Sequence, residues 1–107
     1  MAAETEETVE HLPDMTPGDI LYHEYMEPYG ITKYRPAKDT GMSASRVGDI
    51  IAGRRAITVD AAERLSRYFG NSAQQWLNLQ TSYERRINAR ERDCGAYDKI
   101  ARHAAYV

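Results

Sequence analysis

The sequence predicts an all-α domain of five short helices with a helical C-terminal extension. Residues that start helices recur ahead of apolar positions with helical spacing, and glycines follow the apolar segments. No stretch alternates apolar and polar residues as a strand would, and no internal repeat is present. At 107 residues the chain has room for one modest core, so we expect a single domain.

The first helix is expected to begin after Thr16. A threonine can cap a helix, Pro17 suits the first helical position, and Asp19 lies in the first turn, where the helix dipole favours a negative charge. Apolar and aromatic residues follow at helical spacing. Pro28 and Gly30 are then expected to end the helix.

The second helix is expected between Thr32 and Gly41, and Pro36 is an obstacle to it. Proline lacks an N–H group and costs about 3 kcal/mol in a helix interior. It also moves the preceding residue, Arg35, away from helical geometry. The cost is avoided if the helix starts at the proline. We therefore expect a shortened helix that begins at or near Pro36.

The third and fourth helices each have a capping residue and a terminal glycine, Ser43 with Gly53 and Thr58 with Gly70. The sequence SAQQ at 72–75 is a capping box and opens the fifth and longest helix.

Three segments follow from this pattern. Residues 1–15 are charged and poor in large apolar groups, which predicts an acidic, disordered tail. Residues 16–83 contain the five helices. Residues 84–107 are helix-prone, with an interruption expected at Gly95.

The net charge of −2 hides two opposed halves. Residues 1–32 contain eight carboxylates and no Lys or Arg, whereas the rest of the chain holds all 14 Lys and Arg against 8 carboxylates. A basic body can meet phosphates, and an acidic leader can meet a basic protein, although acidic tails also simply aid solubility.

Several classes of protein are not expected. Cys94 is the only cysteine, so an internal disulfide is excluded. We expect no signal peptide, no membrane span, no metal site, no cofactor and a cytoplasmic protein. No nucleophile–base pair, carboxylate dyad or phosphate loop is present, so we do not expect an enzyme.

Residues 32–55, TKYRPAKDTGMSASRVGDIIAGRR, have the spacing of a helix-turn-helix. Ala37 is the small residue needed where the two helices cross, and Gly41 is the turn glycine. Three apolar residues anchor the second helix from behind. These anchors are Met42, Val47 and Ile50.

The outward residues of this reading helix would face the major groove of DNA. They are Ala44, Ser45, Arg46 and Asp49. Arg46 could make two hydrogen bonds to guanine, or contact a phosphate. Asp49 would repel phosphate, so we expect it to pair with an arginine. Arg54 and Arg55, after the helix, could bind phosphates or compensate the helix dipole.

The stretches PGDILYHEYMEPYGIT and MSASRVGDIIAGRRAITVDAAERLSRYFGNSAQQWLNLQTSYE, together with their spacing, resemble HigA-type antitoxins of bacterial toxin–antitoxin modules. These antitoxins belong to the XRE-like, lambda-repressor-like helix-turn-helix class. The resemblance covers residues 17–83. The chain departs from the family pattern in its second helix, where Pro36 and Thr40 replace buried leucines.

The resemblance implies a dimer without catalytic activity that binds its own promoter and a small ribonuclease toxin related to RelE. It places phosphate contacts on Lys33, Ser43, Arg54 and Arg55. It places dimer contacts in the later part of the fifth helix and the extension, for which the candidates are Tyr83, Ile87 and Ile100.

An acidic segment could cover the basic surface of such a ribonuclease. The candidate toxin-binding residues are Glu4, Glu6, Glu7, Glu10, Glu24 and Glu27. Two alternatives stay open: a stand-alone XRE-type regulator without a toxin, and an interaction module that does not bind DNA.

Overall fold

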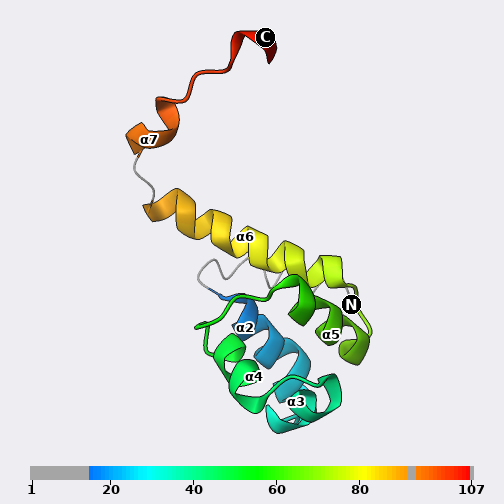
Figure 1. Ribbon diagram of the computed structural model, residues 1–107. Helices are drawn as coiled ribbons and strands as arrows, with labels where there is room; N and C mark the ends of the chain where they lie inside the picture. The colour runs from blue at the N-terminus through cyan, green and yellow to red at the C-terminus, as the bar shows by residue number, and fades with distance from the viewer. Residues whose placement is uncertain (1–14, 92–93, 107) are drawn as a thin grey trace.

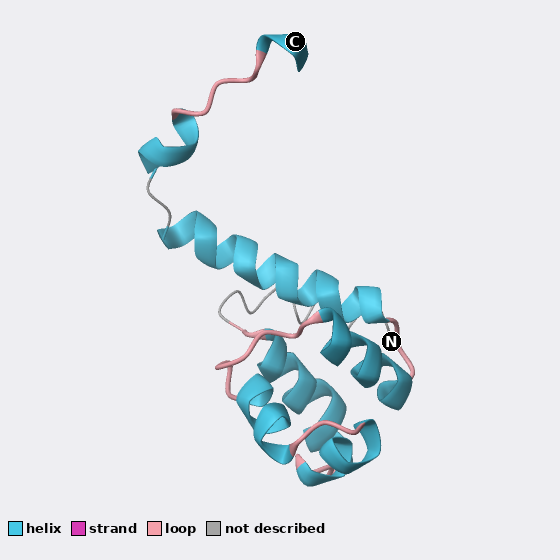
Figure 2. Ribbon diagram, in the orientation of Figure 1, coloured by secondary structure: helices cyan, strands magenta, loops and turns pink. Residues whose placement is uncertain are grey.

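The computed structural model describes residues 15–91 and 94–106, and within these ranges the chain is helical and contains no strand (Figures 1 and 2). The 3-10 and π segments are labelled η. In chain order the elements are α2 (Pro17–Ile20), η1 (Leu21–Met26), η2 (Glu27–Tyr29), α3 (Tyr34–Thr40), α4 (Ala44–Ile51), α5 (Val59–Phe69), α6 (Ala73–Glu91), α7 (Cys94–Asp98) and η3 (Ala104–Tyr106).

The expected start of the first helix is confirmed. The Thr16 hydroxyl accepts a hydrogen bond from the Asp19 N–H, and the Asp19 carboxylate accepts one from the Thr16 N–H, both at 3.0 Å. Pro17 occupies the first helical position. The helix continues through the wider π turn of η1 and ends at Gly30, whose φ of 66° is left-handed.

The second helix begins two residues earlier than predicted, at Tyr34 instead of Pro36. Pro36 is therefore in the first turn, where backbone N–H groups have no intrahelical partner, so its missing N–H costs little. The prediction was wrong because we placed Arg35 outside the helix on account of the proline.

Pro36 and Thr40, the two departures from the family pattern, are both accommodated. The Pro36 side chain is fully buried and serves as an apolar contact in place of an aliphatic residue. The Thr40 hydroxyl donates a hydrogen bond to the Pro36 carbonyl, which satisfies its polar group inside the helix.

The predicted caps of the later helices are confirmed. The hydroxyls of Ser43, Thr58 and Ser72 each accept a hydrogen bond from the backbone N–H three residues later, at 3.0 to 3.2 Å. Gly70 ends α5 with a φ of 81°.

Trp76 of α6 is the largest buried side chain of the core. Its ring lies 5.0 Å from that of Tyr25, and its Nε1 donates to Asn71 Oδ1 at 2.8 Å. A second polar contact joins α6 to the segment before α5, where the buried Gln80 Oε1 accepts from the Ile57 N–H at 2.9 Å. These bonds satisfy buried polar groups and fix the position of α6.

The C-terminal extension projects away from the bundle beyond α6 (Figure 1). The interruption expected at Gly95 is wrong, because Gly95 lies inside α7.

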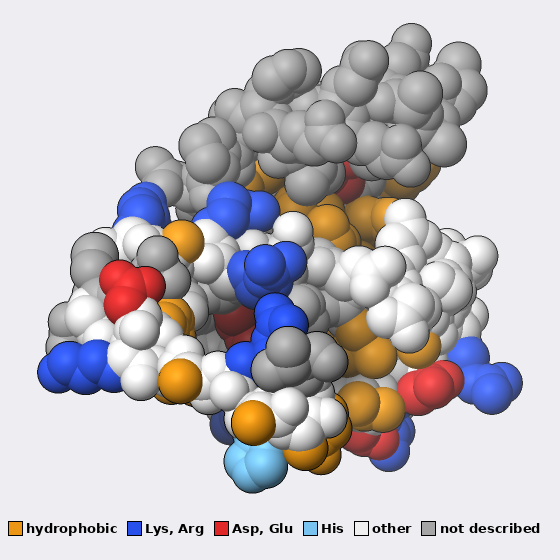
Figure 3. All heavy atoms as spheres, turned by 90° about the horizontal axis from the view of Figure 1, so that it is seen from above, with side chains coloured by type: hydrophobic (Ala, Val, Ile, Leu, Met, Phe, Trp, Pro, Cys, Tyr) orange, Lys and Arg blue, Asp and Glu red, His pale blue; other side chains and the backbone are white. Residues whose placement is uncertain are grey.

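Figure 3 shows the molecule from above, turned by 90° from Figure 1. On this face, basic side chains are interspersed with acidic and hydrophobic ones. None of the helices described is long and apolar enough to cross a membrane.

At Gly18 the backbone of α2 lies against the backbone of α4. A Cβ atom placed there would lie 1.8 Å from the Ile50 carbonyl oxygen, and 2.8 Å from that of Ile51. Both are backbone atoms, so no side chain could rotate away. Only glycine, which has no Cβ atom, lets the two helix backbones lie this close together.

We predict that Gly18→Ala destabilises the protein by about 1–3 kcal/mol or more, because the two helices must separate. Gly48→Ala, in α4, is the matched control. A Cβ there would meet only the Lys33 side chain, at an ordinary 3.5 Å. Since alanine favours a helix, this variant should gain up to about 1 kcal/mol. Urea denaturation measures both, and equal stability of the two variants would contradict the prediction.

Candidate nucleic-acid interface

The pair α3 and α4, joined by the turn 41–43, forms the predicted helix-turn-helix. The turn glycine Gly41 has a φ of 78°, as expected. Ala37 is buried where the helices meet. The predicted anchors Met42, Val47 and Ile50 are all buried. The sequence therefore identified the parts of the motif correctly.

The four predicted groove-facing residues differ in exposure. Ser45 is exposed, whereas Ala44 is half-buried and packs against the core. The Arg46 side chain is 26% exposed and that of Asp49 is 28% exposed. Contact of any of the four with DNA stays a prediction.

Arg46 is held by the neighbouring helix α5. Its Nη2 lies 3.1 Å from Asp60 Oδ2 and donates to Thr58 Oγ1 at 3.3 Å. Asp60 also pairs with Arg64, whose Nε lies 3.0 Å from the same oxygen, and Arg64 Nη1 donates to the Thr40 carbonyl at 2.8 Å. One carboxylate oxygen thus joins two arginines, and the second arginine reaches the end of α3.

Hydrogen bonds from Arg64 and then Arg46 hold the pKa of Asp60 below its ordinary value. The carboxylate is therefore ionised at neutral pH, and its two ion pairs are lost only as the pH falls below the usual range of aspartate. Sequence reasoning missed Asp60. The spacing of four residues between Asp60 and Arg64 was a signal for their pairing, but nothing local relates Asp60 to Arg46.

Arg54 and Arg55 follow a Schellman-type helix end. The Gly53 N–H donates to the Ile50 carbonyl at 3.1 Å, and the Arg54 N–H donates to the Asp49 carbonyl at 2.9 Å. The Asp49 carboxylate lies 3.1 Å from Arg54 Nη2 and 3.8 Å from Arg55 Nη2. The expected pairing of Asp49 with an arginine is confirmed.

Lys33 and Arg54, two of the predicted phosphate-binding residues, line the same hollow of about 570 Å³ beside α4. Lys33 also lies over the Tyr34 ring, with Nζ 5.5 Å from its centre. Ser43 is exposed, and its hydroxyl caps α4. Lys33 and Arg54 thus lie on one side of α4, the reading helix, whereas the Arg46 side chain turns toward α5 on another side.

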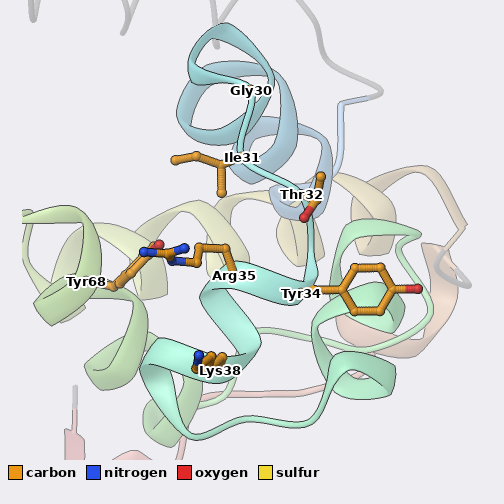
Figure 4. Close-up of a pocket in the computed structure, with 7 residues that line it drawn as sticks. All are labelled: Gly30, Ile31, Thr32, Tyr34, Arg35, Lys38 and Tyr68. Atoms are coloured by element: carbon orange, nitrogen blue, oxygen red, sulfur yellow. The ribbon is translucent and has the colours of Figure 1, made fainter.

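A second hollow, of about 640 Å³, lies between α3, the segment before it and α5 (Figure 4). Figure 4 shows the Arg35 side chain beside Tyr68, whereas Tyr34 points away from both. Burial raises the pKa of Tyr68, and a hydrogen bond to Asp39 adds to the shift. Arg35 Nε lies 3.1 Å from Asp39 Oδ2, so this hollow carries a paired arginine.

Of the candidate toxin-binding residues, Glu27 lines the same hollow as Lys33 and Arg54. Four of the glutamates, Glu4, Glu6, Glu7 and Glu10, are outside the described residues. Glu24 is half-buried, and the exposed Glu27 accepts from His23 at 2.8 Å.

Tyr83 and Ile87 are half-buried and line a hollow of about 440 Å³ on α6. Ile100 is 73% exposed, beyond α7. The structure therefore brings Tyr83 and Ile87 together but not Ile100.

The helix-turn-helix family model (HTH_3) matches residues 23–76. Virulence-associated protein I of Dichelobacter nodosus is 47% identical over 73 residues, which is 68% of each chain. Antitoxin HigA-1 of Vibrio cholerae is 35% identical over 63 residues, or 59% of each chain.

Among solved structures, the Pseudomonas aeruginosa antitoxin HigA with the higBA promoter is 34% identical, with a TM-score of 0.76 over 82% of this chain and 96% of that one. The resemblance to HigA-type antitoxins is thereby confirmed. The chain belongs to the helix-turn-helix family (HTH_3) of the XRE-like class, and HigA antitoxins are among its relatives.

Proposed function

We propose that this chain is an antitoxin that represses its own operon by binding operator DNA as a dimer. The observation that carries the proposal is the match of the whole helical bundle to an antitoxin solved with its promoter. The buried anchors of α4 support it, because they leave the opposite side of this helix to meet a groove. The proposal assigns the chain no catalytic reaction and places it in the cytoplasm, with the DNA.

The contacts would divide into two kinds. Ser45 and Arg46 would read bases from α4, with Ala44 and Asp49 at the edge of the contact. The phosphate-binding residues would be Lys33, Ser43, Arg54 and Arg55. The phosphate contacts proposed for Lys33 and Arg54 are supported by the hollow beside α4 that these two residues share.

A dimer would place two reading helices about 34 Å apart, in successive major grooves. We propose that the partner packs on the part of α6 that carries Tyr83 and Ile87. Both side chains line an open hollow there, and the end of this helix extends beyond the other helices of the bundle (Figure 1).

The second partner would be a small basic ribonuclease related to RelE. The relatives named as antitoxins support this proposal. The eight carboxylates before Lys33 give the chain an acidic segment that complements a surface evolved to bind RNA.

We predict that Arg46→Ala relaxes sequence preference, whereas Arg55→Ala weakens binding to all DNA alike. The first removes a contact to a base edge, worth about 1–3 kcal/mol; the second removes a phosphate contact and lowers the salt slope by about 1. Fluorescence anisotropy over a salt series measures both on duplexes from directly upstream of the coding sequence and on scrambled duplexes.

Arg85→Ala is the control, because Arg85 is exposed on α6 and lines a hollow whose walls come from α6 alone. An unchanged salt slope for Arg55→Ala would exclude its phosphate role. If the wild-type chain bound neither duplex in a salt-dependent way, it would be an interaction module instead.

We predict that Ile87→Glu converts the dimer to a monomer, since it places a charge in the proposed contact. Ala89→Glu is the control, because Ala89 lines a different hollow on α6, with Ser82 and Arg85. Sedimentation velocity at micromolar protein separates the two states. A wild-type protein that is monomeric under these conditions would rule out the dimer.

We predict that co-expression with the product of the neighbouring gene rescues growth and that the two proteins co-purify. Deleting residues 1–14 should weaken the complex at low salt, because it removes five carboxylates. Replacing Glu4, Glu6, Glu7 and Glu10 by Gln keeps the length and should have a similar effect. Affinity unchanged by both changes would place the toxin elsewhere, and a neighbour without toxicity would favour a stand-alone regulator.

A further inference from the structure

The guanidinium of Arg46 is engaged in the protein without DNA. Its Nη2 lies 3.1 Å from Asp60 Oδ2 and 3.3 Å from Thr58 Oγ1. Each nitrogen at the end of an arginine carries two N–H groups, and on Nη2 one of them donates to Thr58 while the same nitrogen forms the ion pair with Asp60. Both contacts therefore fall on Nη2.

A guanidinium has two edges that can make paired hydrogen bonds. One consists of Nε with Nη2, and the other of Nη1 with Nη2, because Nη2 lies on the same side as the Nε–H group. Nη2 therefore belongs to both edges. The paired contact of arginine with guanine O6 and N7 requires a complete edge, so on either edge it competes with Asp60 and Thr58 for Nη2.

The carboxylate that holds Arg46 is itself fixed in place. Asp60 Oδ2 also accepts from Arg64 Nε at 3.0 Å, and Arg64 Nη1 donates to the Thr40 carbonyl at the end of α3. Asp60 therefore cannot follow Arg46 toward DNA without breaking these bonds. The Asp60 side chain is 55% exposed, so water or DNA can compete for the pair.

We propose that Asp60 is a specificity-determining residue that withholds Arg46 from DNA until a guanine takes the place of Asp60 as the partner of Arg46. On the operator, Nη2 exchanges Asp60 for the guanine edge, and Arg64 keeps the carboxylate. On DNA without a guanine at that position, Arg46 stays on Asp60. This inference rests on the proposed DNA-binding function and adds a residue from outside the helix-turn-helix to it.

The first test needs no DNA. NMR of the arginine guanidinium groups reports how fast each rotates about its C–N bonds. Arg46 should rotate slowly in the wild-type protein and at least several-fold faster in Asp60→Asn, which keeps the shape of the side chain and removes its charge. Rapid rotation of Arg46 in the wild-type protein would overturn the proposal.

The second test measures dissociation constants on the upstream duplex at low salt. Asp60→Asn should tighten binding roughly two- to fivefold more than Glu63→Gln, because an exposed ion pair no longer has to be broken. Glu63 is an exposed acid one turn along α5 and controls for the loss of one negative charge. In the Arg46→Ala background, Asp60→Asn and Glu63→Gln should tighten binding equally.

Two results would overturn the proposal. If Asp60→Asn weakened binding, Asp60 would orient Arg46 for its contact instead of withholding it. If the extra tightening persisted with Arg46→Ala, the effect would come from charge alone. A chain with slowly rotating Arg46 but no preference for the upstream duplex over a scrambled one would contradict the proposed function while leaving the Asp60 contact intact.

Discussion

The missing side chain at Gly18 sets how closely the first helix approaches the reading helix. The backbone of α2 lies against the carbonyls of Ile50 and Ile51, at the end of α4. The carbonyls that Gly18 approaches lie at the end of α4, just before the chain turns at Gly53. The direction in which Arg54 and Arg55 leave the helix follows from that turn. Two backbones in contact define this geometry more tightly than two flexible side chains could.

The second feature that organises the molecule is the internal pairing of its charges. Asp49 pairs with Arg54 and Arg55, and Asp60 pairs with Arg46 and Arg64. Such exposed pairs add little to folding stability. They reduce the positive potential that the motif offers to any polyanion, and a DNA partner must compete with two carboxylates. Affinity would then depend on contacts that repay this exchange, which favours a particular sequence over DNA in general.

Pro36 illustrates how far local reasoning reaches. The sequence correctly identified the proline as a residue that a helix interior would not tolerate, and the turn glycine Gly41 and the buried anchors as intact. It misplaced the helix start by two residues, because the first turn accepts a proline as readily as the first position does. The two residues that lengthen the helix, Tyr34 and Arg35, are exposed, whereas Pro36 is buried, and burial depends on what lies opposite.

The sequence by itself determined the helical class, the motif and most helix boundaries. Caps such as Ser43 and Thr58 act across three residues, and left-handed glycines such as Gly41 act within one, so both are readable from the chain. Only the tertiary structure decided that Arg46 of α4 meets Asp60 of α5. The Arg46–Asp60 pair joins two helices whose crossing depends on the whole core, and no local spacing encodes it.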